Sequence, residues 1–392
     1  MKKTGRLFAA IVFLLFAVPI PVAAASGTGV EEDYLDIWME ELDFSELDEL
    51  LGDDLFPNES PLGREKIRFS VIVEELLTVG IKNFDYSLLI GWVKDALFYE
   101  FQTNRRLLIE IVLLAVGFSL LKNFSGAFRE AYISEISFLM VYCILAVLLL
   151  KSFSIYREIA EAALNQSVDF MKVLVPTLSI SMVFSTGTES AAGFYQIAFL
   201  VIYLVQWLFL KILLPLIQIY ILLVLCNHFF EDEKFENLTE LLKGVAGWAM
   251  KSAGLLVLGM NVVQSLIAPA KDRLVSGTVS RVASMIPGVG NALSGVGELL
   301  LGSGILIKNC VGVAALLFLL TLGMVPVLKL WGMSLLYKLA AAIVEPVADK
   351  RIAGCLKGMA EGGFLYLKLV IYCLVLLLVT IALATAASGL AR

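Results

Sequence analysis

Residues that carry enzyme chemistry are scarce in this sequence. Among 392 residues there is one histidine, His228, and the five cysteines include no C-x-x-C pair. Four of the cysteines lie in apolar runs, so we interpret the cysteines as small buried hydrophobic side chains and not as disulfides or metal ligands. His228 has no neighbours that would complete a zinc site, and no Ser/His/Asp set can be assembled. We therefore expect no catalytic site, no metal and no cofactor.

Charge is also scarce. Only 17% of the residues are charged, whereas 59% are hydrophobic, and the mean hydropathy is +0.87. A soluble domain carries roughly a quarter charged residues, so the composition excludes a soluble enzyme and predicts that most of the chain lies in a lipid bilayer. The formal net charge of −6 argues against nucleic acid as a partner, because nucleic-acid binding needs a basic surface.

The N-terminal quarter differs from the rest of the chain. Residues 1–25 have a basic start, an apolar run and an Ala-Ala-Ala end, which is the pattern of a signal peptide; an uncleaved anchor helix is the alternative. Residues 26–104 carry 19 of the 36 acidic residues and five basic ones, and we expect an acidic external region of short helices. Trp38, Leu42 and Phe44 lie among these acids. They are candidates for docking a partner, and a merely solvated face is the alternative.

Residues 105–392 form the predicted transmembrane domain. About 20 apolar residues cross a bilayer, and on that scale the fold class is an all-α polytopic membrane protein with about eight transmembrane helices. The third and fourth candidate spans are nearly fused at Lys211, and the sixth and seventh at Gly323-Met324, so each pair is either a hairpin or one long tilted helix. The eight spans are Leu107–Leu121, Ile133–Leu150, Ser190–Gln206, Leu208–Asn227, Val245–Ile267, Gly304–Leu322, Val325–Ile343 and Phe364–Ala386.

Polar residues within or beside these spans are few. We interpret most of the charged ones as side chains that snorkel to the membrane interface, although ionisable groups inside a membrane are also functional candidates. Asn261 and Gln264 share one face of a predicted helix and are a candidate polar contact. The charged residues concerned are Glu110, Glu135, Lys211, Lys251, Lys308 and Lys329.

An internal repeat is suggested by matched prolines. The separation between Pro176 and Pro287 in the chain equals that between Pro215 and Pro326. The repeat units are about 133–228 and 244–339. With both fused pairs read as hairpins, each unit has three spans, so the second unit would be inverted relative to the first, as in many transporters. Chance matching of apolar sequence is the alternative.

Two Pro/Gly segments, one in each unit, are candidates for broken or re-entrant membrane helices. Each begins at a proline and ends at a carboxylate. Non-helical backbone is tolerated at membrane depth where protein or water satisfies its polar groups, so these segments are candidates for lining a pore or substrate site. Close helix packing by small residues is the alternative. The candidate residues are Pro176, Ser179, Ser181, Ser185, Thr188, Glu189, Pro287, Gly290, Ser294, Gly297 and Glu298.

Two runs, MKVLVPTL at residues 171–178 and STGTESAA at residues 185–192, together with the overall layout, resemble the stage III sporulation protein AE family. The resemblance implies a non-enzymatic protein of the mother-cell membrane facing the engulfed forespore. It also implies other membrane proteins as partners, in a channel or secretion-like assembly that links the two cells. A self-sufficient secondary transporter or permease is the alternative function, and a homo-oligomer is compatible with either.

Overall fold

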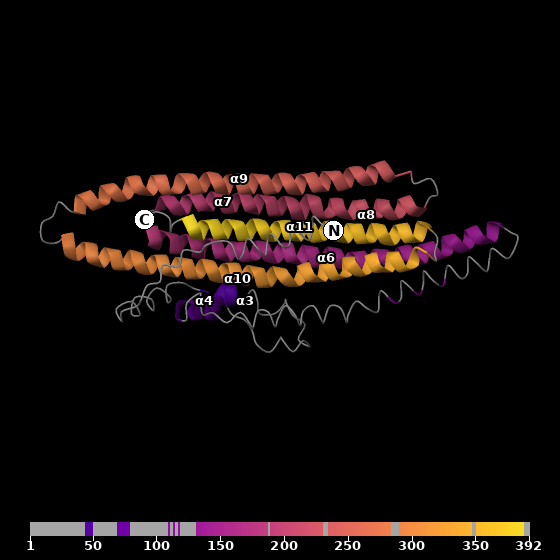
Figure 1. Cartoon of the computed structure of the whole chain (residues 1–392), viewed down its shortest axis with the longest axis horizontal. Helices are drawn as coiled ribbons and strands as arrows, with labels where there is room; N and C mark the ends of the chain where they lie inside the picture. Colours follow the sequence, from indigo (N-terminus) through magenta and orange to yellow (C-terminus); the bar gives the residue numbers. More distant parts are fainter. Residues whose placement is uncertain are drawn as a thin grey trace.

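The body of the protein is a bundle of long helices (Figure 1). The computed structural model describes residues 44–49, 69–78, 109, 113, 117, 131–186, 189–229, 234–283, 290–346 and 350–387. Within these residues every regular element is a helix, which confirms the predicted all-α fold. The elements are α3 (Ser45–Glu49), α4 (Phe69–Thr78), α6 (Ala131–Thr186), α7 (Glu189–Leu208), η2 (Phe209–Leu213), α8 (Leu214–Phe229), α9 (Glu236–Ala283), α10 (Gly290–Val344) and α11 (Lys350–Ala387).

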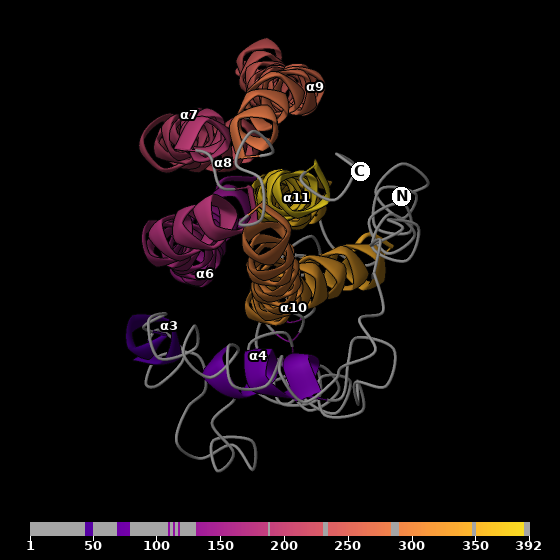
Figure 2. The same cartoon turned by 90° about the vertical axis from the view of Figure 1, so that its left-hand side faces the viewer.

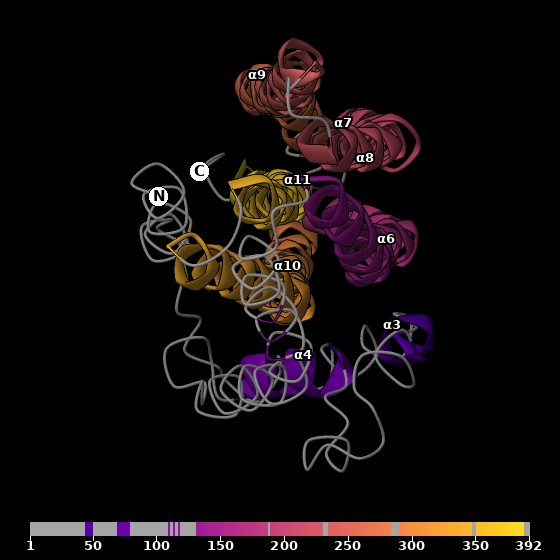
Figure 3. The ribbon, with the colours of Figure 1, turned by 90° about the vertical axis from the view of Figure 1, so that its right-hand side faces the viewer.

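Successive long helices run in opposite directions (Figure 1), and α11 lies in the middle of the bundle (Figures 2 and 3). Two contacts at different heights fix the direction of α6 against α8: Tyr142 bonds to Leu225, and Arg157 bonds to Gln218. Because the residue number on α6 rises from one contact to the other while the residue number on α8 falls, these helices are antiparallel. The corresponding pairs are Lys308–Thr385 and Gly323–Leu374 for the antiparallel α10 and α11, and Gly254–Tyr372 and Asn261–Thr380 for the parallel α9 and α11.

Four helices in the described residues are long and apolar enough to cross a membrane, by length and composition: 196–229, 236–263, 307–344 and 350–385. Eight spans are therefore not confirmed. Of the first candidate span, Leu107–Leu121, the structure describes residues 109, 113 and 117 only. The 38 residues of 307–344 extend about 57 Å at about 1.5 Å per residue, well beyond the roughly 30 Å of a hydrocarbon core.

Both fused pairs are continuous helical paths, so the hairpin interpretation is wrong and the long-helix alternative holds. At Lys211 the chain widens into the π-helical turn η2 and continues directly into α8. Pro215 explains this turn, because it has no N–H for an ordinary helical bond and its ring crowds the preceding turn. At Gly323-Met324 the helix α10 continues without interruption and contains Pro326. Hydropathy alone divides these runs into bilayer-sized lengths, whereas the backbone continues through each run as one helical path.

Continuity of the helices also removes the basis for an inverted repeat. The unit at 133–228 is α6 followed by α7 to α8, and the unit at 244–339 falls on α9 followed by α10. Each unit therefore contains two helical passes instead of three. An even number of passes returns the chain to its starting side, so the second unit runs in the same direction as the first.

Glycines on α11 allow α8 to pack closely against it. A Cβ atom added to Gly354, Gly358 or Gly362 would lie well inside contact distance of a side chain on α8. These three glycines recur every four residues, so they share one face of the helix. In a membrane, where helices gain little from the hydrophobic effect, such close packing supplies much of the association energy.

Candidate functional site

The first predicted Pro/Gly segment is helical from its proline to Thr186. Pro176 lies inside α6, which continues to Thr186, so no break occurs between these two residues; residues 187–188 of the segment lie outside the described residues. The hydroxyls of Ser179 and Ser181 bond to carbonyls one turn earlier in the same helix, at 2.7 and 2.9 Å. Such bonds explain how polar groups and a proline are tolerated in an apolar helix.

The remaining predicted pore residues lie in helices or outside the described residues. Glu189 is the first residue of α7, and Gly290 is the first of α10. Ser185 is in the last turn of α6, whereas Ser294, Gly297 and Glu298 are in the first turns of α10. Thr188 and Pro287 lie outside the described residues, so the meeting of the two segments stays a prediction.

Phe44, a predicted docking residue, is buried within the chain. It is 6% exposed, and its ring lies 5.5 Å from that of Phe69 on α4. Phe69 in turn packs on Phe318 of α10, which stacks on Phe170 of α6. Ser70 donates two hydrogen bonds to Asp48, which ties α4 to α3. The acidic region therefore uses Phe44 to pack against its own bundle; Trp38 and Leu42 lie outside the described residues.

Buried polar groups follow the central helix α11 from end to end. Near its start, the hydroxyl of Tyr142 bonds to the Leu225 carbonyl and lies 3.1 Å from the Cys355 sulfur. Further along, the amide nitrogen of Gln206 donates to the Cys373 sulfur at 3.5 Å. These side chains come from α6, α7 and α11, so the polar groups connect different helices of the core.

The middle of this polar row contains serine and tyrosine hydroxyls. Tyr337 of α10 donates a hydrogen bond to Ser152 of α6, and Ser334 bonds to its own helix at Leu330. Tyr156 is fully buried beside them, and its hydroxyl lies near the Ser334 hydroxyl without a hydrogen bond of good geometry. The side-chain oxygen of Gln206 is likewise buried without a partner. Buried polar atoms of this kind carry a desolvation cost of about 1–3 kcal/mol each.

The far end of the row holds a buried cation. Lys308 is fully buried and donates at 2.9 Å to the Thr385 carbonyl in the last turn of α11. A cation is favoured there, because the carbonyls at a helix end carry partial negative charge. Lys308 therefore does not snorkel, whereas Lys211 and Lys251 are exposed. One turn earlier, Asn261 donates to Thr380 at 2.7 Å, so the predicted polar contact of Asn261 exists but joins α9 to α11.

Charged groups on the outside of the bundle form pairs within and between helices. Lys243 of α9 pairs with Glu361 of α11 at 2.6 Å, and both side chains are about half exposed. Arg157 of α6 reaches both Glu161 and Gln218. On α6 the Asp169 carboxylate accepts a hydrogen bond from Lys172, which raises the pKa of that lysine. The side chains of the three ion pairs are all partly exposed, so these charges lie on the outside of the helices.

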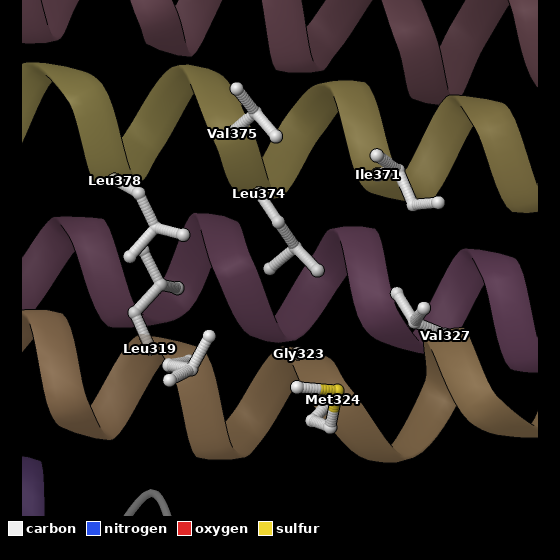
Figure 4. A pocket seen from close by; sticks show the side chains of 9 residues that line it. Leu319, Gly323, Met324, Val327, Ile371, Leu374, Val375 and Leu378 are labelled. Atoms are coloured by element: carbon white, nitrogen blue, oxygen red, sulfur yellow. The ribbon is translucent and has the colours of Figure 1, made fainter. Parts of the chain in front are cut away.

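The cysteines and the pockets offer no reactive centre in the part of the chain that the structure describes. Cys310, Cys355 and Cys373 are buried as predicted, but Cys143 and Cys226 are exposed. No three His, Cys, Asp or Glu residues among the described ones are placed to hold a metal ion. A cavity of about 40 Å³ lies between α10 and α11, around Gly323 and Leu374, and Figure 4 shows its apolar lining.

Sequence patterns alone did not reveal the polar row. Cys373, Thr380 and Thr385 recur along α11, but they lie among so many apolar residues that hydropathy averages hide them. The available signal was that polar side chains inside an apolar run need a partner on another helix.

These features define a class: an all-helical membrane protein with a core held by small residues and interhelical hydrogen bonds. The chain belongs to the stage III sporulation protein AE family, whose model matches residues 67–388, and the resemblance seen in the sequence is confirmed. The chain is also 28% identical to stage III sporulation protein AE of Bacillus subtilis (strain 168) over 269 residues, or 68% of this chain and 67% of that relative. No solved structure matches it.

Proposed function

We propose that this protein is a non-enzymatic integral membrane subunit of a multi-protein channel or secretion-like assembly that acts during endospore formation. The observation that carries the proposal is membership of the stage III sporulation protein AE family across most of the helical bundle. We place the protein in the mother-cell membrane that faces the engulfed forespore, with other membrane proteins of the assembly as partners.

The close packing of the described core supports a subunit over a self-sufficient transporter. A transporter that acts alone needs a hollow where a few polar groups converge on the solute. The cavity between α10 and α11 is small and apolar, and the buried polar groups along α11 mostly bond to one another or to the backbone. A conduit shared between several proteins does not require such a hollow inside one subunit.

Purification from sporulating cells tests this proposal. The tagged full-length protein, solubilised in mild detergent, is expected to retain the same set of sporulation membrane proteins in every preparation. Gly362→Leu, which places a large side chain against α8, is expected to lose those partners and the ability to complement a null strain. Gly247→Leu is the matched control, because a Cβ there meets nothing within 4 Å.

Reconstitution separates the two functions. The purified protein alone in lipid vesicles is expected to leave ion and small-solute gradients intact. Saturable solute flux by the protein alone, combined with purification free of partners, would contradict the proposal and establish the transporter alternative.

The predicted partner contact of the acidic region is tested by substitutions at Trp38 and Leu42. Phe44 is not suitable for this test, because its side chain is buried within the chain.

A further inference from the structure

Four helical paths change from charged to uncharged sequence at one level of the bundle. Each has an uncharged run of about 20 residues, the length that crosses a bilayer, and a lysine stands at one end of each run. The runs and their lysines are 190–210 with Lys211, 252–270 with Lys251, 309–328 with Lys329 and 369–391 with Lys368.

Contacts between the helices show that these four lysines are level with one another. Leu374 of α11 lies against Gly323 of the antiparallel α10. Lys368 precedes Leu374 by six residues and Lys329 follows Gly323 by six, so the two lysines lie at the same height. The same counting brings the other two lysines within one turn of Lys368, from the contact Gln206–Cys373 for Lys211 and the contact Gly254–Tyr372 for Lys251.

The uncharged runs locate the hydrocarbon layer of the membrane. All four lie on the same side of the lysine level and extend about 30 Å at about 1.5 Å per residue. The other half of the bundle carries charges on α9, α10 and α11, such as Glu240, Lys338 and Arg351, and it fits hydrocarbon poorly. The middle of the layer therefore falls near Phe318, halfway along 309–328.

Helix α6 passes through this layer with a polar outer side. The ring of Phe170 stacks on that of Phe318, with their centres 5.1 Å apart, so α6 reaches the middle of the layer near Phe170. Yet α6 is not one of the four described helices that are apolar enough to cross a membrane. We call its outward side the α6 polar face; it comprises Glu158, Glu161, Asn165, Asp169 and Lys172, which are exposed or half-buried and three or four positions apart.

An exposed ion pair stands at the deep end of the α6 polar face. The Lys172 Nζ lies 2.7 Å from the Asp169 Oδ1, and the two side chains are 57% and 48% exposed. The pair is roughly 15 Å from the lysine level at about 1.5 Å per residue, too far for a side chain to snorkel to the interface. Charged groups at such depth face the interior of a bundle or a water-filled cavity, and this pair is outside the bundle.

Other outward side chains at the same depth are apolar. Leu200 on α7 is 61% exposed, and Val262 on α9 is 54% exposed. Helices α6 and α9 lie on different sides of α11 (Figures 2 and 3). At one depth in the membrane, the bundle therefore has sides suited to lipid and one side suited to water.

We propose that the α6 polar face borders a water-filled space that reaches from the lysine level to the middle of the membrane. Its occupants are water, dissolved ions and small polar solutes. Because the face points away from the bundle, the opposite wall belongs to a neighbouring protein of the assembly, and in this respect the inference rests on the proposed function. The space would pass beside a subunit whose own core is closed.

Thiol labelling in membranes from sporulating cells tests whether water reaches the face. The exposed Cys143 and Cys226 are first changed to serine. Asn165→Cys is then expected to react with a charged methanethiosulfonate reagent at least about tenfold faster than Leu256→Cys, because the reactive thiolate is disfavoured in apolar surroundings. Leu256 is the matched control, since it is 56% exposed at about the same depth on α9. Equal labelling would overturn the proposal: if slow, the face is covered, and if fast, this level lies outside the membrane.

A second test makes the deep end of the face apolar. Asp169→Leu/Lys172→Leu is expected to insert, to retain partners and to lose complementation of a null strain. The exchange variant Asp169→Lys/Lys172→Asp keeps both charges, and it is expected to complement. Full complementation by the leucine variant would overturn the proposal.

The two proposals fail separately. Retained partners with equal labelling of Asn165→Cys and Leu256→Cys would reject the water-filled space and leave the proposed function intact. Loss of partners with fast labelling of Asn165→Cys alone would reject the proposed assembly and leave the α6 polar face in contact with water.

Discussion

Helices α9 and α11 are both long and apolar enough to cross a membrane, but they have opposite places in the bundle. Their apolar stretches are 28 and 36 residues long, yet 22% of the α9 window is buried against 67% of the α11 window. Helix α11 lies at the centre and α9 at the edge (Figure 2). Length identifies both helices as candidate spans, and the more apolar of the two is the one that forms the core.

The difference lies in which side chains the two helices offer to their neighbours. Helix α11 presents glycines that accept side chains of α8, and polar groups that bond to α6, α7, α9 and α10. Helix α9 touches the bundle along one side and leaves the opposite side, with Trp248 and Leu255, exposed. A central helix is thus distinguished by small residues and hydrogen bonds, because apolar bulk alone gains little in a lipid environment.

The largest expected effect comes from filling a glycine contact on α11. Gly362→Leu would force a side chain against Ile221, and overpacking of this kind costs about 1–3 kcal/mol or more. Gly247→Leu on α9 meets open space and is expected to be neutral or slightly stabilising, because glycine is a poor helix former. Thermal unfolding in detergent measures both, and similar losses would show that the two helices are equally packed.

A smaller loss is expected when the hydrogen bond between the two helices is removed. Asn261→Leu breaks the bond to Thr380, whose hydroxyl keeps its bond to the Leu376 carbonyl, so the cost is about 1 kcal/mol. Tyr156→Phe removes a buried hydroxyl that makes no hydrogen bond of good geometry and is expected to change stability by less than Asn261→Leu. Denaturant titration of both variants in the same detergent gives the comparison, and a stabilising Asn261→Leu would contradict the role of this bond.

Breaking the exposed ion pair between α9 and α11 is expected to cost still less. Lys243 and Glu361 lie 2.6 Å apart but are 46% and 41% exposed, so solvent screening limits the pair to about 0.2–1 kcal/mol. Glu361→Gln should lower stability slightly at low salt, and the difference from wild type should shrink at high salt. A loss of several kcal/mol that is insensitive to salt would mean that the pair is buried by an unseen partner or by lipid.

The smallest effect on the fold is expected on the exposed side of α9. Trp248→Ala should change the stability of the protein by less than about 0.5 kcal/mol, because the side chain is 70% exposed. Thermal unfolding in the same detergent tests this expectation. A large loss would show that Trp248 packs against the bundle.

The sequence predicted the helical class, the membrane setting and the family, but not the number of passes. Local hydropathy divides an apolar run wherever a bilayer-sized length has accumulated, so it separated the runs at Lys211 and at Gly323-Met324. The backbone continues through both, with a π-helical turn before Pro215 and an unbroken helix around Pro326. Among the predicted pore residues, Ser179 and Ser181 bond to carbonyls of their own helix. The sequence does not distinguish such hydroxyls from hydroxyls that line a channel, so the pore itself stays a prediction.

Composition by itself determined that this chain is a helical membrane protein, because so many apolar residues and so few charges cannot form a water-soluble core. Only the tertiary structure decided that Lys308 is buried at the end of α11, that Phe44 packs inside the chain, and that α9 leaves one face exposed. Each of these outcomes depends on a neighbour from a distant part of the chain, or on the lack of one in the described residues. Burial and hydrogen bonding depend on which residues meet. The sequence contains both partners of each contact, but only the packing of the helices brings them together.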